Sequence, residues 1–224
     1  MTPQEFRYEF DLLYNNIMSD MAPGLDDYEV SLFLTEAQEE LVQQLYTGSA
    51  QFDGFESSEK VRRNLANLIV HGTAALSNPI AYGNGYWEYR TSIGGVLALI
   101  SERAKIVDTK CCDNTKWVNV VPIKYDEINK VIENPFRRPN NHQILRLDNK
   151  TSEVRLITKA IAKEYVFEYL AKPAPIIVSD LPSGFSINGQ TSAQSSALDE
   201  SLHRPIIKYA VQLAAASWAS NNKN

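Results

Sequence analysis

The sequence predicts an α+β protein with a helical N-terminal part, a small antiparallel β-sheet with an inserted helix, and a C-terminal helix. Three observations support this prediction. Apolar residues recur at helical spacing in the first third of the chain, short runs rich in Val, Ile and aromatic residues follow, and an apolar stripe at helical spacing returns near the end. At 224 residues the chain can bury a substantial core, and we expect a single domain over residues 1–224.

The helical part is expected over residues 1–80. One face of a first helix carries four apolar residues at spacings of three or four: Phe6, Phe10, Leu13 and Ile17. In a second helix, Thr35 is followed three residues later by Gln38, a spacing typical of a capping box. Gly48 is expected to end that helix.

A third helix is expected to open at Ser57 or Ser58. Its apolar side would carry Val61, Leu65, Leu68, Ile69 and Leu76. Asn78-Pro79 would end it, because the residue before a proline disfavours the α conformation.

Residues 82–178 are expected to be mainly β. Short runs such as KWVNVVPI and EVRLIT are rich in β-branched residues and are bounded by Asp, Asn, Pro or Gly. One helix interrupts them at about residues 126–133, starting at acidic residues and stopping at Asn134-Pro135.

The last part of the chain combines a loop with a helix. Residues 179–197 hold six serines among Gly, Pro, Asn and Gln, which predicts a flexible loop or a segment that orders on assembly. A C-terminal helix is expected over residues 201–220, because apolar residues recur there at helical spacing.

Charge and composition narrow the possible functions. The net charge is −5, from 22 basic and 27 acidic residues, which argues against sequence-specific DNA binding by the fold as a whole. It is compatible with a surface that DNA passes without being gripped. We expect no membrane span and no secretory signal, because no apolar run is long enough and the N-terminus is polar.

The cysteines and histidines do not suggest a disulfide or a zinc site. Cys111 and Cys112 are adjacent, which rarely permits an unstrained disulfide, and two thiols without further ligands do not bind zinc. We expect both cysteines to be reduced and structural. The three histidines, His71, His142 and His203, lie far apart in the sequence.

Glu200 and His203 form a Glu-x-x-His pair, a spacing that holds metal in some helical bundles. Such sites use the pair twice, and no second copy is present. Pro205 also places the pair at the start of a helix, because proline fits best in a first turn. We therefore interpret Asp199, Glu200 and Ser201 as a helix cap, with His203 as part of it, and expect no metal ligand.

Other catalytic patterns are also missing from the sequence. It has no Gly-x-Ser-x-Gly elbow, and Gly83-Asn84-Gly85 lacks the rest of a phosphate-binding loop. Carboxylates are abundant, but nothing in the sequence pairs two of them across a cleft. We expect no catalytic residue and no cofactor, and a tail-associated hydrolase remains an alternative.

Two regions are candidates for contacts with partners. Arg137 and Arg138 lie between two prolines on a stiff loop that could meet an acidic surface or DNA phosphate, or could be a solvated turn. The C-terminal helix ends in an alanine-rich stretch with a tryptophan, which suits close packing against another chain. Its candidate interface residues are Leu202, His203, Ile206, Tyr209, Leu213 and Trp218.

Four stretches in order point to a family: PGLDDYEVSLFLTEAQEELVQQLY, KYDEINKVIENPFRRPN, YLAKPAPIIV and LDESLHRPIIKYAVQLAAASW. Together they resemble the head-to-tail connector, or neck ring, proteins of short-tailed crAss-like phages of gut Bacteroidetes. The resemblance spans roughly residues 20 to 220, and it depends on the order and combination of the stretches.

The resemblance implies a structural virion protein of the neck or tail, made in the cytoplasm of the host bacterium. Such a protein would form a ring, typically of twelve copies, that continues the DNA channel. Its partners would be copies of itself, the portal, an adjacent tail or ring protein, and double-stranded DNA passing through the lumen without specific contacts. A protein outside the virion that acts in assembly or binds a partner is a further alternative.

Overall fold

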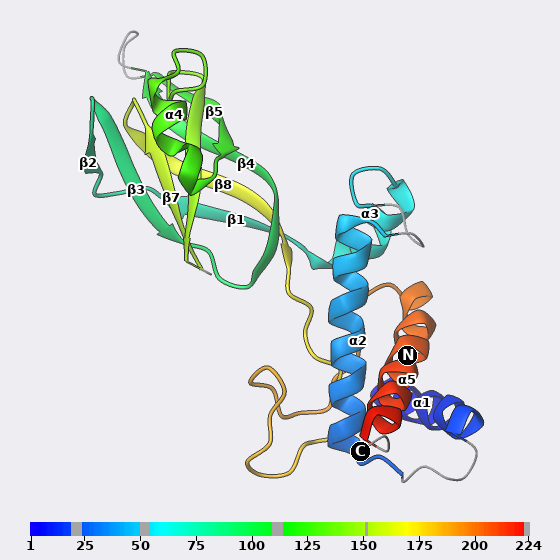
Figure 1. The fold of residues 1–224 in the computed structure, drawn as a ribbon. Coiled ribbons are helices and arrows are strands. Elements are labelled where there is room, and N and C mark those ends of the chain that lie inside the picture. The colour runs from blue at the N-terminus through cyan, green and yellow to red at the C-terminus, as the bar shows by residue number, and fades with distance from the viewer. Residues whose placement is uncertain (19–23, 50–53, 109–113, 151, 222–224) are drawn as a thin grey trace. The chain divides into compact units, whose positions relative to one another are not determined.

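The computed structural model describes residues 1–18, 24–49, 54–108, 114–150 and 152–221 (Figure 1). The chain divides into two compact units. Residues 1–68 and 172–224 form a helical unit, and residues 69–171 form a β unit inserted between these two segments. The α+β class is confirmed, and the expectation of a single domain stays a prediction. Cys111 and Cys112 lie outside the described residues.

The helical unit is built on three helices that pack together. They are α1 (Pro3–Met18), α2 (Asp27–Thr47) and α5 (His203–Asn221), with the short α3 (Glu59–Leu65), η1 (Ala66–Leu68) and η3 (Glu200–Leu202) beside them. α5 packs against both α1 and α2 (Figure 1). The buried core side chains come from all three helices: Phe6, Phe10, Tyr14, Leu34, Val42, Ile206, Ile207 and Val211. On α1 the buried stripe therefore continues to Tyr14, while Ile17 is exposed.

The capping box of α2 is formed by Asp26 and Glu29, which precede the predicted pair. The Asp26 carboxylate accepts a hydrogen bond from the Glu29 amide at 2.8 Å, and the Glu29 carboxylate accepts one from the Asp26 amide at 3.0 Å. The predicted box at Thr35 and Gln38 is wrong, because both residues are buried inside α2. Gly48 ends the helix as predicted, with a positive φ of 82° that favours glycine.

The predicted third helix is too long. α3 ends at Leu65, and β1 (Ile69–Ala75) follows η1, so the helical part does not reach residue 80. β1 pairs with the last strand of the β unit and places Gly72 opposite Phe167. A Cβ atom at Gly72 would lie 2.4 Å from that ring, so the close approach requires glycine.

The β unit contains an eight-stranded mixed sheet in the order β1-β8-β4-β5-β6-β7-β3-β2. Its remaining strands are β2 (Ile80–Gly83), β3 (Tyr86–Ser92), β4 (Val96–Asp108), β5 (Asn114–Pro122), β6 (Gln143–Lys150), β7 (Glu153–Thr158) and β8 (Ala162–Ala171). All neighbours are antiparallel except β5 and β6. The predicted small antiparallel sheet is therefore an eight-stranded mixed sheet. Its parallel pair requires a crossover connection, which the inserted helix provides.

That crossover contains η2 (Tyr125–Glu127) and α4 (Ile128–Glu133), close to the predicted helix at 126–133. α4 covers one face of the sheet, where Val131 packs with Leu145 and Ile157. The opposite face carries the larger core, which includes Tyr89, Ile144 and Tyr165. Adjacent residues of β6 thus point into different cores, as the alternation of a strand requires.

Candidate interaction surfaces

The start of α5 is a structural cap. The Asp199 carboxylate accepts a hydrogen bond from the Ser201 amide at 3.0 Å, as expected of a cap. His203 is only 3% exposed, and its Nε2 lies 3.1 Å from the Leu198 carbonyl oxygen. Since a carbonyl can only accept, Nε2 carries the proton, and Nδ1 accepts from the amino terminus of Met1 at 3.2 Å.

Burial lowers the pKa of the His203 imidazole, and the positively charged amino terminus lowers it further. A neutral imidazole fits its two hydrogen bonds, so His203 joins the start of α1 to the start of α5. Within the described residues no group of three or more His, Cys, Asp or Glu side chains is placed to hold a metal ion. Among the described helices none is long and apolar enough to cross a membrane.

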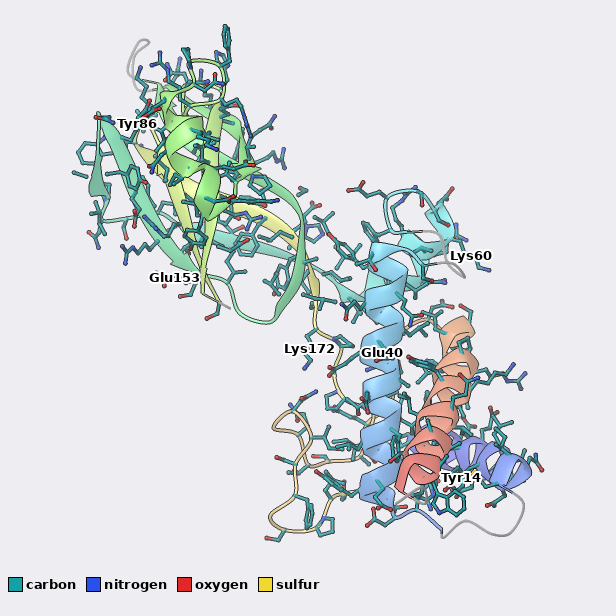
Figure 2. The ribbon with its side chains drawn as sticks, viewed as in Figure 1. Tyr14, Glu40, Lys60, Tyr86, Glu153 and Lys172 are labelled. Atoms are coloured by element: carbon teal, nitrogen blue, oxygen red, sulfur yellow. The ribbon has the colours of Figure 1, made fainter. Side chains whose placement is uncertain are left out.

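The six candidate interface residues of the C-terminal helix divide into two groups. Leu202, His203 and Ile206 are buried in the core of their own unit, which corrects their expected role at a surface. Tyr209, Leu213 and Trp218 are partly exposed. The Tyr209 hydroxyl donates a hydrogen bond to the carboxylate of Glu40 on α2, which Figure 2 labels. An apolar stripe identifies the buried side of a helix. On α5, other helices of the same chain cover most of that side.

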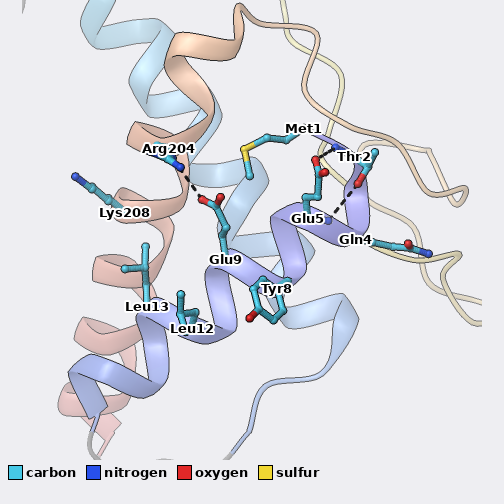
Figure 3. A pocket seen from close by; sticks show the side chains of 10 residues that line it. All are labelled: Met1, Thr2, Gln4, Glu5, Tyr8, Glu9, Leu12, Leu13, Arg204 and Lys208. Atoms are coloured by element: carbon cyan, nitrogen blue, oxygen red, sulfur yellow. Dashed lines mark hydrogen bonds and ion pairs between the residues drawn. The ribbon is translucent and has the colours of Figure 1, made fainter.

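A groove of about 900 Å³ lies between α1 and the start of α5 (Figure 3). Its lining includes Met1, Glu5, Tyr8, Leu12, Arg204 and Lys208. Tyr8 is 70% exposed and Leu12 is 51% exposed, so α1 presents apolar side chains to solvent as well as to the core. The sequence reasoning missed this groove because the second face of α1 also carries charged residues.

Polar side chains of α2 hold the segment that follows the β unit. The amides of Ile176 and Val178 donate to the hydroxyls of Thr35 and Ser31, both at 3.1 Å. The Gln38 amide nitrogen donates to the carbonyl of Ala174 at 2.7 Å. These hydrogen bonds explain why such residues are buried on an otherwise apolar helix.

The loop at 179–197 continues along the helical unit. Isolated β-bridges join Ile177 to Gln194 and Ile187 to Gln190. Asn188 donates to the Glu39 carboxylate at 2.9 Å. The loop therefore has defined turns and is attached to α2, although it forms no regular helix or strand between residues 179 and 197.

Loop and helix together enclose a recess of about 360 Å³, which we call the acidic recess. Its walls include Leu32, Glu36, Glu39, Glu40, Ile187 and Asn188. Leu32 is 41% exposed and Glu36 is exposed. Lys172 pairs with Glu39 at 3.1 Å, and the Glu40 carboxylate accepts the hydrogen bond from the Tyr209 hydroxyl.

The predicted contact loop, residues 134–142, is here called the Arg loop. Its tip consists of Phe136, Arg137 and Arg138, all exposed. The Gln143 side chain donates to the carbonyls of Arg137 at 2.9 Å and Arg138 at 3.0 Å. The Asn134 side chain accepts from the Phe136 amide at 2.9 Å.

Phe136 is 90% exposed, the highest value among the exposed large apolar residues of the described chain. The sequence reasoning singled out the arginines and missed this phenylalanine. The available signal was an aromatic residue within a polar, proline-bounded loop.

Buried charges occupy the interior of the β unit. Arg146 pairs with Glu102 at 2.9 Å, and both side chains are less than 10% exposed. Tyr165 donates to Glu102 at 2.8 Å, and Arg146 also binds Asp148. Burial raises the pKa of the Glu102 carboxyl, and the Arg146 guanidinium opposes that rise. Both carboxylates bind one arginine, which is the arrangement of a structural ion pair and not of a hydrolase pair across a cleft.

The two units carry opposite net charges. The β unit has 14 Lys and Arg residues against 11 Asp and Glu residues, a difference of +3. The helical unit has 8 against 16, a difference of −8. The overall charge of −5 is therefore the sum of a basic β unit and an acidic helical unit.

Comparison with known proteins identifies the family. A model of the phage tail ring protein 3/4 family matches residues 1–224. The chain belongs to this family. It is 34% identical to "Ring protein 3" of Bacteroides phage crAss001, over 97% of this chain and 96% of that protein. It is 32% identical to "Ring protein 4/5" of the same phage, over 97% of this chain and 94% of that protein.

The family match confirms the resemblance to crAss-like phage ring proteins. It makes the chain a bacteriophage ring protein. The Arg loop, the acidic recess and the exposed part of α5 are the candidate contacts of this ring protein.

Proposed function

We propose that the chain forms a closed homo-oligomeric ring in the neck of the virion, between portal and tail, and that it has no enzymatic activity. The observation that carries this proposal is similarity over nearly the full length to two proteins named as ring proteins. Double-stranded DNA passes through the lumen of the ring, which continues the channel of the portal. Twelve copies are proposed, as in the connector rings that the sequence resembles.

The charge distribution supports a ring of this kind. In a closed ring each subunit uses two different faces, so the two faces must complement each other. A chain with one acidic and one basic unit provides such faces. The net negative charge also suits a channel component that DNA passes without tight binding.

The proposed partners are other copies of this chain, the portal, and the next ring or tail protein. Tyr209, Leu213 and Trp218 are the proposed contacts of α5, because they are the partly exposed members of its predicted set. Arg137 and Arg138 are the proposed polar contacts of the β unit. The protein is made in the cytoplasm of the host bacterium and becomes part of the virion.

Mass measurement of the purified chain, alone and with its portal, tests the proposal. We expect an oligomer whose mass is a multiple of 25.2 kDa, formed alone or on the portal. Cryo-electron microscopy of the neck should then show a ring into which both units fit. A chain that stays monomeric with and without portal would contradict the proposal. Absence from purified particles would favour the assembly-protein alternative, and turnover of a cell-wall substrate would favour the hydrolase.

A further inference from the structure

The Arg loop is built to present three side chains. Asn134 accepts from the Phe136 amide through its side chain, and its carbonyl accepts from the amides of Arg137 at 3.2 Å and Arg138 at 3.0 Å. Gln143 binds the loop carbonyls from the other side. The backbone is therefore held before any partner binds, which reduces the entropy lost on binding.

The tip has the composition of a protein-binding anchor. Aromatic residues and arginine are enriched where interfaces bury most of their binding energy. Phe136 is 90% exposed, and the Arg137 side chain is 60% exposed with only a 3.8 Å ion pair to Glu127. An aromatic ring this exposed is explained if a partner covers it.

Charge distinguishes the recesses of the described surface. Those of about 280, 470 and 480 Å³ each include an arginine in their lining, Arg146, Arg204 and Arg7 respectively. The groove between α1 and α5 carries Arg204, Lys208 and the amino terminus, and these cations outnumber its two carboxylates, Glu5 and Glu9. The acidic recess carries three glutamates, and it exposes Leu32 beside them. The acidic recess combines an apolar surface for the ring with carboxylates for the guanidinium groups, and the described residues that line it include no lysine or arginine.

We propose that the Arg loop of one copy inserts into the acidic recess of a second copy. Phe136 packs against Leu32 and Ile187, and Arg137 and Arg138 pair with the exposed carboxylate of Glu36 and its neighbours. The loop lies in the β unit and the recess in the helical unit, so the contact joins different faces, as a ring requires. The inference rests on the proposed ring and specifies the contact that closes it.

Charge reversal of each side tests the contact. The variant Arg137→Glu/Arg138→Glu and the variant Glu36→Arg should each weaken self-association at least about tenfold, measured by analytical ultracentrifugation of the full chain. All three side chains are exposed, so circular dichroism should show unchanged folding. Phe136→Ala should weaken association to a similar degree without any change of charge.

Matched controls reverse charge elsewhere in the same units. Lys159→Glu/Lys163→Glu makes the same change as the arginine variant on exposed residues of the β unit. Glu59→Arg makes the same change as Glu36→Arg on α3, where the Glu59 side chain is 83% exposed. Association of both controls should stay within about twofold of the natural chain, because most of the remaining surface charges contribute little to affinity.

Mixing the two reversed variants provides the decisive measurement. In a mixture, the natural loop of the Glu36→Arg chain meets a natural recess, and the reversed loop meets the reversed recess. Association should therefore return in the mixture although each variant fails alone. A photo-crosslinking amino acid at position 136 should also give a crosslink between two chains, with a peptide of α2 or of residues 179–197 as the product.

The outcomes distinguish failure of the ring from failure of the contact. A natural chain that associates neither alone nor with its portal would overturn the ring and this contact together. A ring that persists in the Arg137→Glu/Arg138→Glu and Phe136→Ala variants would overturn the contact and leave the ring proposal intact. A crosslink within one chain, or to a peptide outside the acidic recess, would likewise overturn the contact alone.

Discussion

The helical unit and the β unit bury polar groups in different ways. In the helical unit, Thr35 and Gln38 are buried because they satisfy the backbone of the segment at 174–178. In the β unit, Glu102 and Arg146 are buried because they satisfy each other. Removing a neutral partner leaves an unpaired dipole, whereas removing a charged partner leaves an unpaired charge. The same kind of substitution should therefore have a larger effect in the β unit.

Replacing Arg146 tests the larger half of this comparison. Arg146→Met should lower the free energy of unfolding of the β unit by about 3–5 kcal/mol, because Glu102 then remains buried without its counter-charge. The loss should shrink as pH falls, since burial raises the pKa of Glu102 and protonation removes the unpaired charge. Urea unfolding at several pH values measures this effect in chains that carry Trp218→Phe, where the emission comes from Trp87 and Trp117 of the β unit.

The control is Arg103→Met, which changes an exposed arginine on β4 that stacks on Trp117. It should lower stability by no more than about 1 kcal/mol. Equal losses in both variants, or a loss for Arg146→Met that is independent of pH, would contradict the assignment of a buried ion pair.

Replacing Gln38 tests the smaller effect that is expected in the helical unit. Gln38→Leu removes the donor to the Ala174 carbonyl and the acceptor of the Ser196 hydroxyl. We expect a loss of about 1–3 kcal/mol in the helical unit, because those groups become unpaired. Gln43→Leu, on an exposed position of the same helix, should change stability by less than about 0.5 kcal/mol. Thermal unfolding followed at 222 nm compares the two, and a loss for Gln38→Leu as large as that for Arg146→Met would remove the distinction between the units.

The N-termini of helices also differ between the two units. α2 has a reciprocal capping box, whereas Glu127 at the start of α4 makes no side-chain capping hydrogen bond. Asp26→Ala should therefore destabilise the helical unit by about 1 kcal/mol. Glu127→Ala should have a smaller effect, because it loses only an exposed ion pair with Arg137. Chemical denaturation of the two variants in parallel measures both losses of stability. A larger loss for Glu127→Ala than for Asp26→Ala would contradict the assignment of these caps.

The smallest expected effect is a difference in pH dependence. The pKa of His203 is lowered in the folded chain, so its contribution to stability is present above the ordinary value of 6.5 and is lost as pH falls below it. The Glu102 contribution has the opposite sign, because a raised carboxyl pKa favours folding as pH falls. The protection of α5 amides from hydrogen exchange should weaken below pH 6.5 in the natural chain. In His203→Gln this protection should depend less on pH. His142→Gln, on the exposed Arg loop, is the control and should keep the natural dependence.

Local patterns in the sequence identified many elements but not their partners. Phe6 and Phe10 marked the buried face of α1, and acidic residues before Asn134-Pro135 marked α4. Thr35 and Gln38 were misread as a cap, because the same residue types also bind backbone, and the backbone they bind lies more than 130 residues away. Position in space, and not composition, separates these two roles.

The segment from Ile69 to Ala75 shows the same limit for secondary structure. A short apolar run fits a helix or a buried strand, and only its pairing with β8 decides between them. The candidate contact surfaces also differ in whether the sequence predicts them. Arg137 and Arg138 were found from charge and prolines, whereas the acidic recess joins residues of α2 to a loop about 150 positions later, which no local pattern contains.

The insertion of the β unit between two segments of the helical unit has a consequence for synthesis. α1 and α2 leave the ribosome long before α5, which supplies the buried side chains Ile206, Ile207 and Val211. At bacterial rates of roughly 5–20 residues per second, about 150 intervening residues take roughly 8–30 seconds. During that interval the apolar faces of both helices lack their cover while the β unit can already fold. The order of the chain therefore delays completion of the helical unit until α5 has been synthesised.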